Sequence, residues 1–151
     1  MSCNGCTLCC KVLPVPEFNK SAGEHCSDCG YSGCLIHSVR PDICRNFFCC
    51  WLRYKWEEDL RPDKCRVVFE LVPGCSTYVG TVDFKGHLGK FSRSDSLESW
   101  IIGVVNRNRA VVLSNGSQRQ VFAPNGVGSN QVLGELKFAY EKWMKQLEGN
   151  K

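Results

Sequence analysis

The stretch Cys3-Asn4-Gly5-Cys6-Thr7-Leu8-Cys9-Cys10 places four cysteines within eight residues. Six more follow by residue 50, in the pattern Cys26-x2-Cys29-x4-Cys34-x9-Cys44-x4-Cys49-Cys50. Cysteines separated by two residues can point their sulfurs at one ion from a tight turn, so this spacing is typical of zinc sites. The repeated spacing therefore predicts that bound metal, rather than an apolar core, folds the first third of the chain.

The N-terminal segment also carries few aliphatic residues, and these follow no long helical or strand period. A segment of about fifty residues with so little apolar surface does not offset its own chain entropy. A structural zinc site contributes on the order of 10–16 kcal/mol of apparent binding free energy. We therefore predict a cysteine-rich metal-binding segment, residues 1–56, and a small α+β segment, residues 64–151. The charged residues 57–63 connect them into one compact unit.

The second half of the chain has the pattern of a conventional small domain. The predicted strands are residues 66–72, 77–84, 110–113 and 120–122, and the predicted helices are residues 94–107 and 129–147. Asn115-Gly116 separates the last two strands and is a strong hairpin signal. These elements predict an α+β fold, in which the metal-stabilised N-terminal segment packs on a small antiparallel sheet with two helices against one face.

Composition and compartment agree with a metal-binding protein. Of the 151 residues, 43% are hydrophobic and 23% are charged, which is an ordinary globular balance. No apolar run is long enough to span a membrane, and the N-terminus lacks the basic and apolar stretches of a signal peptide. We therefore expect a cytoplasmic protein without a membrane partner. Clustered cysteines in that reducing compartment indicate metal rather than the alternative, a disulfide scaffold.

The formal net charge of +4 lies entirely in residues 51–151, because residues 1–50 hold four basic and four acidic side chains. The formula also counts every cysteine as neutral, whereas metal ligands are thiolates. Two zinc ions held by eight thiolates would bring the total to about zero. The charge therefore argues against a nucleic-acid partner, while a protein partner stays open.

The cysteine count leaves the metal open. Taken in fours, the cysteines fit two tetrahedral zinc sites, which would be structural and redox-silent. They also fit one iron–sulfur cluster with spare thiols, which would serve electron transfer or Lewis-acid chemistry. Short Cys-x2-Cys turns in a small module favour zinc. Because Cys9 and Cys10 are adjacent, we expect one of them to serve a second centre or to pack as a thiol.

Two blocks of this segment resemble a known family. The first is Cys3-x2-Cys6-x2-Cys9-Cys10, and the second is Cys34-Leu35-Ile36-His37-Ser38-Val39-Arg40-Pro41-Asp42-Ile43-Cys44-Arg45-Asn46-Phe47. Both are similar to the bacterial YkgJ family of zinc- or iron-chelating cysteine-cluster proteins, over residues 3–53. The resemblance implies that the ligands are Cys3, Cys6, Cys9, Cys10, Cys34, Cys44 and Cys49. Cys26 and Cys29 correspond to a family position that occurs singly or doubled, and they complete our predicted ligand set.

The chain departs from the family at His37, where tyrosine is usual, and we expect this side chain to pack near the cluster. We expect Arg40 and Arg45 to offset the negative charge of a metal–thiolate site. Cys50, Cys65 and Cys75 fall outside the motif and are expected to be buried thiols.

The predicted function is that of a metal-binding protein. It would hold one or two ions, zinc before iron, in all-cysteine sites with a structural or metal-handling role. One alternative is an iron–sulfur protein that acts in electron transfer or as part of an enzyme. Another is a zinc-finger-like adaptor for a protein partner. No carboxylate pair or Ser/His/Asp order emerges from the sequence, so no catalytic residue is assigned and an enzyme is not favoured.

Overall fold

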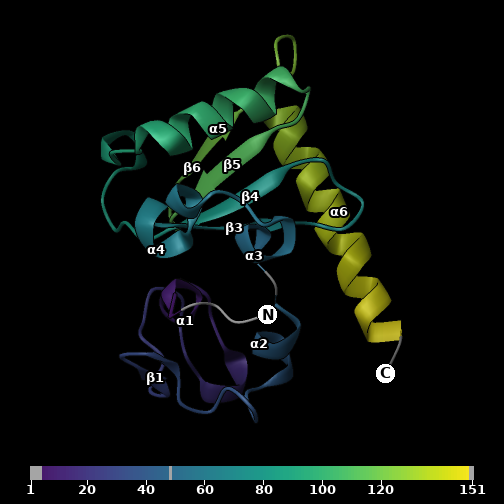
Figure 1. The fold of residues 1–151 in the computed structure, drawn as a ribbon. Helices are drawn as coiled ribbons and strands as arrows, with labels where there is room; N and C mark the ends of the chain where they lie inside the picture. The colour runs from purple at the N-terminus through teal and green to yellow at the C-terminus, as the bar shows by residue number, and fades with distance from the viewer. Residues whose placement is uncertain (1–4, 48, 150–151) are drawn as a thin grey trace.

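The computed structural model describes residues 5–47 and 49–149, and its main body is a four-stranded sheet with a helix on each face (Figure 1). The strands, in their spatial order, are β3 (Val67–Leu71), β4 (Tyr78–Val82), β5 (Val111–Ser114) and β6 (Arg119–Phe122). The two long helices are α5 (Asp95–Asn106) and α6 (Ser129–Gly149). The predicted α+β class is confirmed, and each of these elements lies within a few residues of its predicted position.

The sheet is mixed, and the prediction of an antiparallel sheet is wrong for its central pair. Strands β3 and β4 are antiparallel, as are β5 and β6, but β4 and β5 run parallel. The reason is the connection between β4 and β5, which contains η3 (Leu88–Lys90) and α5. A connection of this length crosses over the sheet and returns the chain in the same direction.

Helix α5 covers one face of the sheet. Its N-terminus is capped by the Ser94 side chain, which accepts a hydrogen bond from the Leu97 backbone N–H at 3.3 Å. Leu97, Ile101 and Val104 lie on one side of the helix because they recur at helical spacing. They are buried against the sheet side chains Val67, Phe69, Val111 and Leu113.

Helix α6 lies on the opposite face, so the prediction that both helices share one face is wrong. Side chains alternate along a strand, and Val112 therefore points away from its neighbours Val111 and Leu113. Val112 packs with the α6 residues Val132 and Leu136 in a separate core. In Figure 1, α5 runs above the sheet and α6 runs down its right side.

The N-terminal segment consists of short elements placed beside β3. They are α1 (Leu8–Val12), η1 (Pro16–Phe18), β1 (Cys29–Gly30), β2 (Gly33–Cys34), α2 (Asp42–Asn46) and α3 (Cys50–Tyr54). Val12 and Cys49 pack on Val68, which lies on the same face of the sheet as Val112. Lys11 Nζ also forms an ion pair with the Asp83 carboxylate at 2.8 Å. The segment is therefore docked at one edge of the sheet, at the bottom of Figure 1.

The predicted connector, residues 57–63, is folded. It contains η2 (Glu58–Leu60) and the start of α4 (Pro62–Cys65), and both Leu60 and Cys65 are buried in the core beneath α5. The two parts of the chain are thus joined by ordered structure. None of the helices in the described part of the chain combines the length and apolar character needed to cross a bilayer.

Candidate metal centre

Burial is distributed very unevenly along the chain. Not one side chain between residues 21 and 47, all of which the structure describes, is buried. In the sheet, by contrast, Val67, Val111 and Leu113 are 0% exposed. Apolar burial is the main favourable term in folding. Residues 21–47 lack this term almost completely. Four of the predicted ligand cysteines, Cys26, Cys29, Cys34 and Cys44, lie in this stretch.

Helix α1 places Cys9 and Cys10. The Cys10 backbone N–H donates to the Thr7 carbonyl at 2.9 Å, which closes the first turn of the helix. The two neighbouring thiols interact with each other, and Cys10 also contacts the Cys29 thiol. The hydrogen bond with Cys9 and burial both raise the pKa of the Cys10 thiol well above its ordinary value.

A short hairpin supplies three more thiols. Cys29 in β1 lies directly opposite Cys34 in β2, so their side chains share one face of the ribbon with Cβ atoms about 5 Å apart. The Cys29 backbone N–H donates to the Cys26 carbonyl at 3.1 Å, which forms the tight Cys-x2-Cys turn that the spacing predicts. The Cys26 N–H in turn donates to the Cys10 carbonyl at 3.0 Å and joins the hairpin to α1.

Gly30 plays a different part from the one its position suggests. A glycine after a Cys-x2-Cys turn is expected to leave the turn with positive φ, but the positive-φ glycine of this hairpin is Gly33, with φ 135°. Gly30 instead allows a close approach, because a Cβ at this position would lie 2.7 Å from Leu35 Cδ2.

Helix α2 brings Cys44 to the same place. The helix begins after Pro41, whose carbonyl accepts from the Arg45 backbone N–H at 2.9 Å. Burial raises the pKa of the Cys44 thiol, and negative charge on Cys10, Cys26 and Cys34 raises it further. Thiols from α1, the hairpin and α2 therefore lie near enough for the charge of one to affect another. We call them the six-thiol group, and its members are Cys9, Cys10, Cys26, Cys29, Cys34 and Cys44.

Two further predicted ligands, Cys6 and Cys49, lie where the N-terminal segment meets the sheet. Burial raises the pKa of the Cys6 thiol, while hydrogen bonds from the backbone of Leu8 and Asp63 lower it, and the charges of Asp63 and Cys49 act on it as well. Cys49 is 8% exposed and packs against Val12 and Val68. Cys6 and Cys49 therefore lie at the junction with the sheet, and Cys9 packs against the same apolar cluster as Cys49. Cys3 is outside the described residues.

Two cations lie beside the six-thiol group, and the sequence prediction missed one of them. Lys20 is only 8% exposed, and its ammonium donates to the carbonyls of Lys11, Leu13 and Ser21. Its charge opposes the rise in the pKa of Cys10. Arg40 has the same effect on Cys34. No sequence signal marks Lys20, because a lysine in a polar loop is ordinarily exposed.

The remaining predictions about this segment can be compared directly with the structure. The Arg40 guanidinium contacts His37 Nε2 at 2.5 Å, and Arg45 Nη2 donates to the Arg40 carbonyl at 3.1 Å. His37 is exposed and partnered by arginine. Cys50 and Cys65 are buried, as predicted, whereas Cys75 is half-buried.

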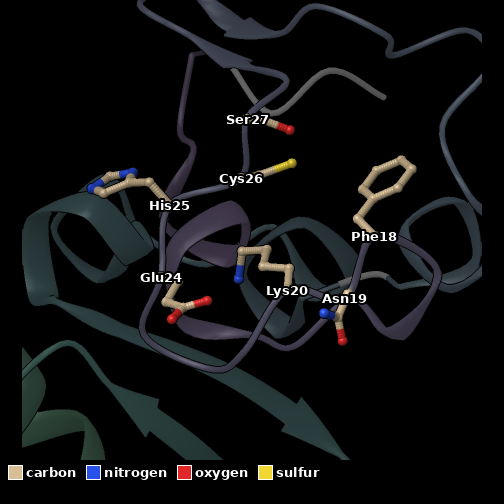
Figure 2. Close-up of a pocket in the computed structure, with 7 residues that line it drawn as sticks. All are labelled: Phe18, Asn19, Lys20, Glu24, His25, Cys26 and Ser27. Atoms are coloured by element: carbon tan, nitrogen blue, oxygen red, sulfur yellow. The ribbon is translucent and has the colours of Figure 1, made fainter.

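A hollow of about 190 Å³ opens beside the six-thiol group, and Figure 2 shows the residues that line it. The Cys26 sulfur points into the hollow, and the Lys20 side chain is part of its lining. The His25 ring points away from it. This opening connects one member of the six-thiol group with solvent, which an incoming ion would need.

No disulfide joins any two of the described cysteines, so their sulfur atoms remain available as ligands. Sulfur donors fit a soft divalent ion. Within the described part of the chain, however, no set of three or more His, Cys, Asp or Glu side chains is placed so that it could hold an ion. The thiols of the six-thiol group are therefore near one another but are not placed closely enough to share an ion. Binding an ion would therefore require them to move closer together.

No protein-family model matches the chain, and no curated protein or solved structure matches it either. The function has to be inferred from the residues themselves.

Proposed function

We propose that this chain is a metal-binding protein whose N-terminal cysteines hold one or two zinc ions in a mainly structural or metal-handling role. The observation that carries the proposal is the contrast between burial and thiol placement. Residues 21–47 have no buried side chain, yet thiols from three separate elements gather there. Metal–sulfur bonds would supply the stabilisation that apolar packing does not provide.

The surroundings of the thiols support a bound cation. Burial and mutual repulsion raise the pKa values of Cys29, Cys34 and Cys44, so several thiolates would not coexist there without a positive charge. A divalent ion supplies that charge and displaces the protons. The proposal includes a reducing compartment, the cytoplasm, because oxidation would remove the donors. The resemblance of residues 3–53 to the YkgJ family also supports the proposal.

Elemental analysis of anaerobically purified full-length protein tests the proposal. We expect a colourless protein with one to two zinc ions per chain. Cys44→Ser should lower the zinc content, whereas Cys75→Ser, a half-buried cysteine outside the six-thiol group, should leave it unchanged. Equal zinc contents in the two variants would contradict the proposed ligands. A brown protein that contains iron and sulfide, and that bleaches with dithionite, would replace zinc by an iron–sulfur cluster.

A further inference from the structure

The two edges of the four-stranded sheet differ in what lies beside them. Strand β3, at one edge, is packed against α1, α3 and α4. Strand β6 forms the other edge, and among the described residues β5 is the only strand that pairs with it. An edge strand presents a row of unpaired N–H and C=O groups to any chain that approaches it.

The turn between β5 and β6 shows which backbone groups of β6 face inward. The Asn115 N–H donates to the Gln118 carbonyl at 3.3 Å, so these two residues form a hydrogen-bonded pair. In an antiparallel ladder, hydrogen-bonded and non-hydrogen-bonded pairs alternate along the strand. Gln120 and Phe122 are therefore the β6 residues whose backbone groups bond β5, opposite which they lie in the register.

Arg119 and Val121 occupy the positions between them. Their N–H and C=O groups consequently point away from β5, toward the outside of the sheet. Within the described part of the chain, no hydrogen bond reaches any of these groups. They offer two donors and two acceptors at strand spacing.

There is room beside this strand. A hollow of about 410 Å³ opens between η3 and the start of β6. It is lined by His87, Leu88, Gly89, Gln118, Arg119 and Gln120. A chain that runs along β6 could place a side chain in this hollow.

The chain segments that border this edge are basic. Residues 84–94 and 115–128 contain no Asp or Glu, and their Lys and Arg residues are Lys85, Lys90, Arg93 and Arg119. The charge of Arg93 is offset by Glu98 on α5, in an ion pair at 2.5 Å. The other three side chains are exposed, so the surroundings of the edge favour an acidic ligand.

We propose that β6 is a docking edge for an extended, acidic segment of a partner protein, which adds to the sheet as a further strand. Its backbone would bond the outward groups of Arg119 and Val121, and its carboxylates would face Lys85, Lys90 and Arg119. A second copy of this chain is the less suitable occupant, because edge-to-edge pairing would bring like charges together. The inference does not depend on bound metal, since the thiols lie beyond the opposite edge.

Amide hydrogen exchange read by NMR tests the inference on the full-length chain. The probe is a synthetic peptide of about six residues in which threonine and glutamate alternate, added at about 1 mM, where even a weak complex forms. The amides of Arg119 and Val121 should exchange at least about tenfold more slowly with the peptide bound. The amides of Gln120 and Phe122 are the internal controls, because they already bond β5 and should not change.

Two comparisons separate strand pairing from attraction between charges. A peptide that is methylated at every backbone nitrogen keeps its carboxylates but cannot donate hydrogen bonds, and it should leave the exchange of Arg119 and Val121 unchanged. Arg119→Glu should weaken binding of the unmodified peptide by about three- to tenfold. Arg53→Glu makes the same charge change on α3, at the β3 edge, and should leave the affinity unaltered.

Several results would overturn the inference. Unchanged exchange at both outward amides in the presence of the unmodified peptide would show that no strand adds there. Equal effects of the methylated and unmodified peptides would show that charge alone attracts the peptide. Protection of the same amides by self-association, at rising protein concentration and without peptide, would make a second copy the occupant.

Discussion

If the chain binds zinc as proposed, removing the ion with a chelator should open residues 21–47 selectively. No side chain of this stretch is buried, so little besides the metal would resist local unfolding. The strands beside it keep their own cores, where Val67, Val111 and Leu113 are 0% exposed. The chelator should therefore affect one part of the molecule and spare the other.

The size of the effect follows from linkage. A ligand that binds only the ordered state stabilises that state by RT ln(1 + [L]/Kd), which is about 4.1 kcal/mol when the free ligand exceeds Kd by about a thousandfold. Amide exchange that occurs through local opening would then be about a thousandfold slower with the metal bound than without it. On chelation, exchange in residues 21–47 should accelerate by up to about a thousandfold.

Hydrogen exchange read by mass spectrometry or NMR measures this change. The best reporters are amides that are hydrogen-bonded in this stretch, namely Cys26, Cys29 and Leu35, whose bonds measure 3.0, 3.1 and 2.8 Å. Amides of β3 and β5 serve as internal controls. If the reporters exchanged equally slowly with and without chelator while the metal was shown to be gone, the idea that metal orders this stretch would be refuted.

Three further predictions concern stability. In Gly80→Ala the added Cβ would meet three buried side chains at 2.7 Å, so urea unfolding should show a loss of about 1–3 kcal/mol. The helical control Gly103→Ala, with its nearest neighbour at 3.7 Å, should gain about 0.5–1 kcal/mol, and equal effects would contradict this packing. Lys20→Met should destabilise the protein by about 1–3 kcal/mol, because three carbonyls lose their donor. The control is Lys11→Met, which removes a partly exposed ion pair and should cost about 1 kcal/mol or less. Thermal melts measure the loss of stability in both lysine variants. Burial raises the pKa of Cys65 from 9.0 to about 11, so the folded state keeps a proton that the unfolded state loses, and stability falls by about 2 kcal/mol as the pH rises from 9 to 11. Cys65→Ala should fall less steeply over that range in pH-dependent urea titrations, and identical slopes would show that this thiol does not titrate as described.

Local patterns were sufficient to predict most elements of the α+β part. Residues 94–107 repeat apolar side chains at helical spacing, and the structure forms α5 there with Leu97, Ile101 and Val104 buried. Asn115-Gly116 indicated a hairpin, and the Asn115 N–H bonds the Gln118 carbonyl across that turn at 3.3 Å. Such signals depend on residues only a few positions apart, so one sequence carries them completely.

The sequence predicted which cysteines belong to the candidate site better than it predicted which of them lie together. The Cys-x2-Cys spacing marked the thiols, and the structure places Cys26, Cys29 and Cys34 together on a hairpin. Spacing did not reveal that Cys6 and Cys49 lie at the junction with the sheet. Which thiols face one another depends on how α1, the hairpin and α2 fold back, and sequence distance does not specify that.

The amino-acid sequence by itself determined the supply of thiols, the scarcity of apolar side chains around them, and the position of the two long helices and of the strands in the four-stranded sheet. Only the tertiary structure decided that β4 and β5 run parallel, that α5 and α6 lie on opposite faces, and that Lys20 is buried beside Cys10. The physical reason is the range of the interactions. Helix and turn signals act between near neighbours, whereas strand direction, the choice of face and the burial of a charge depend on contacts between residues far apart in the chain.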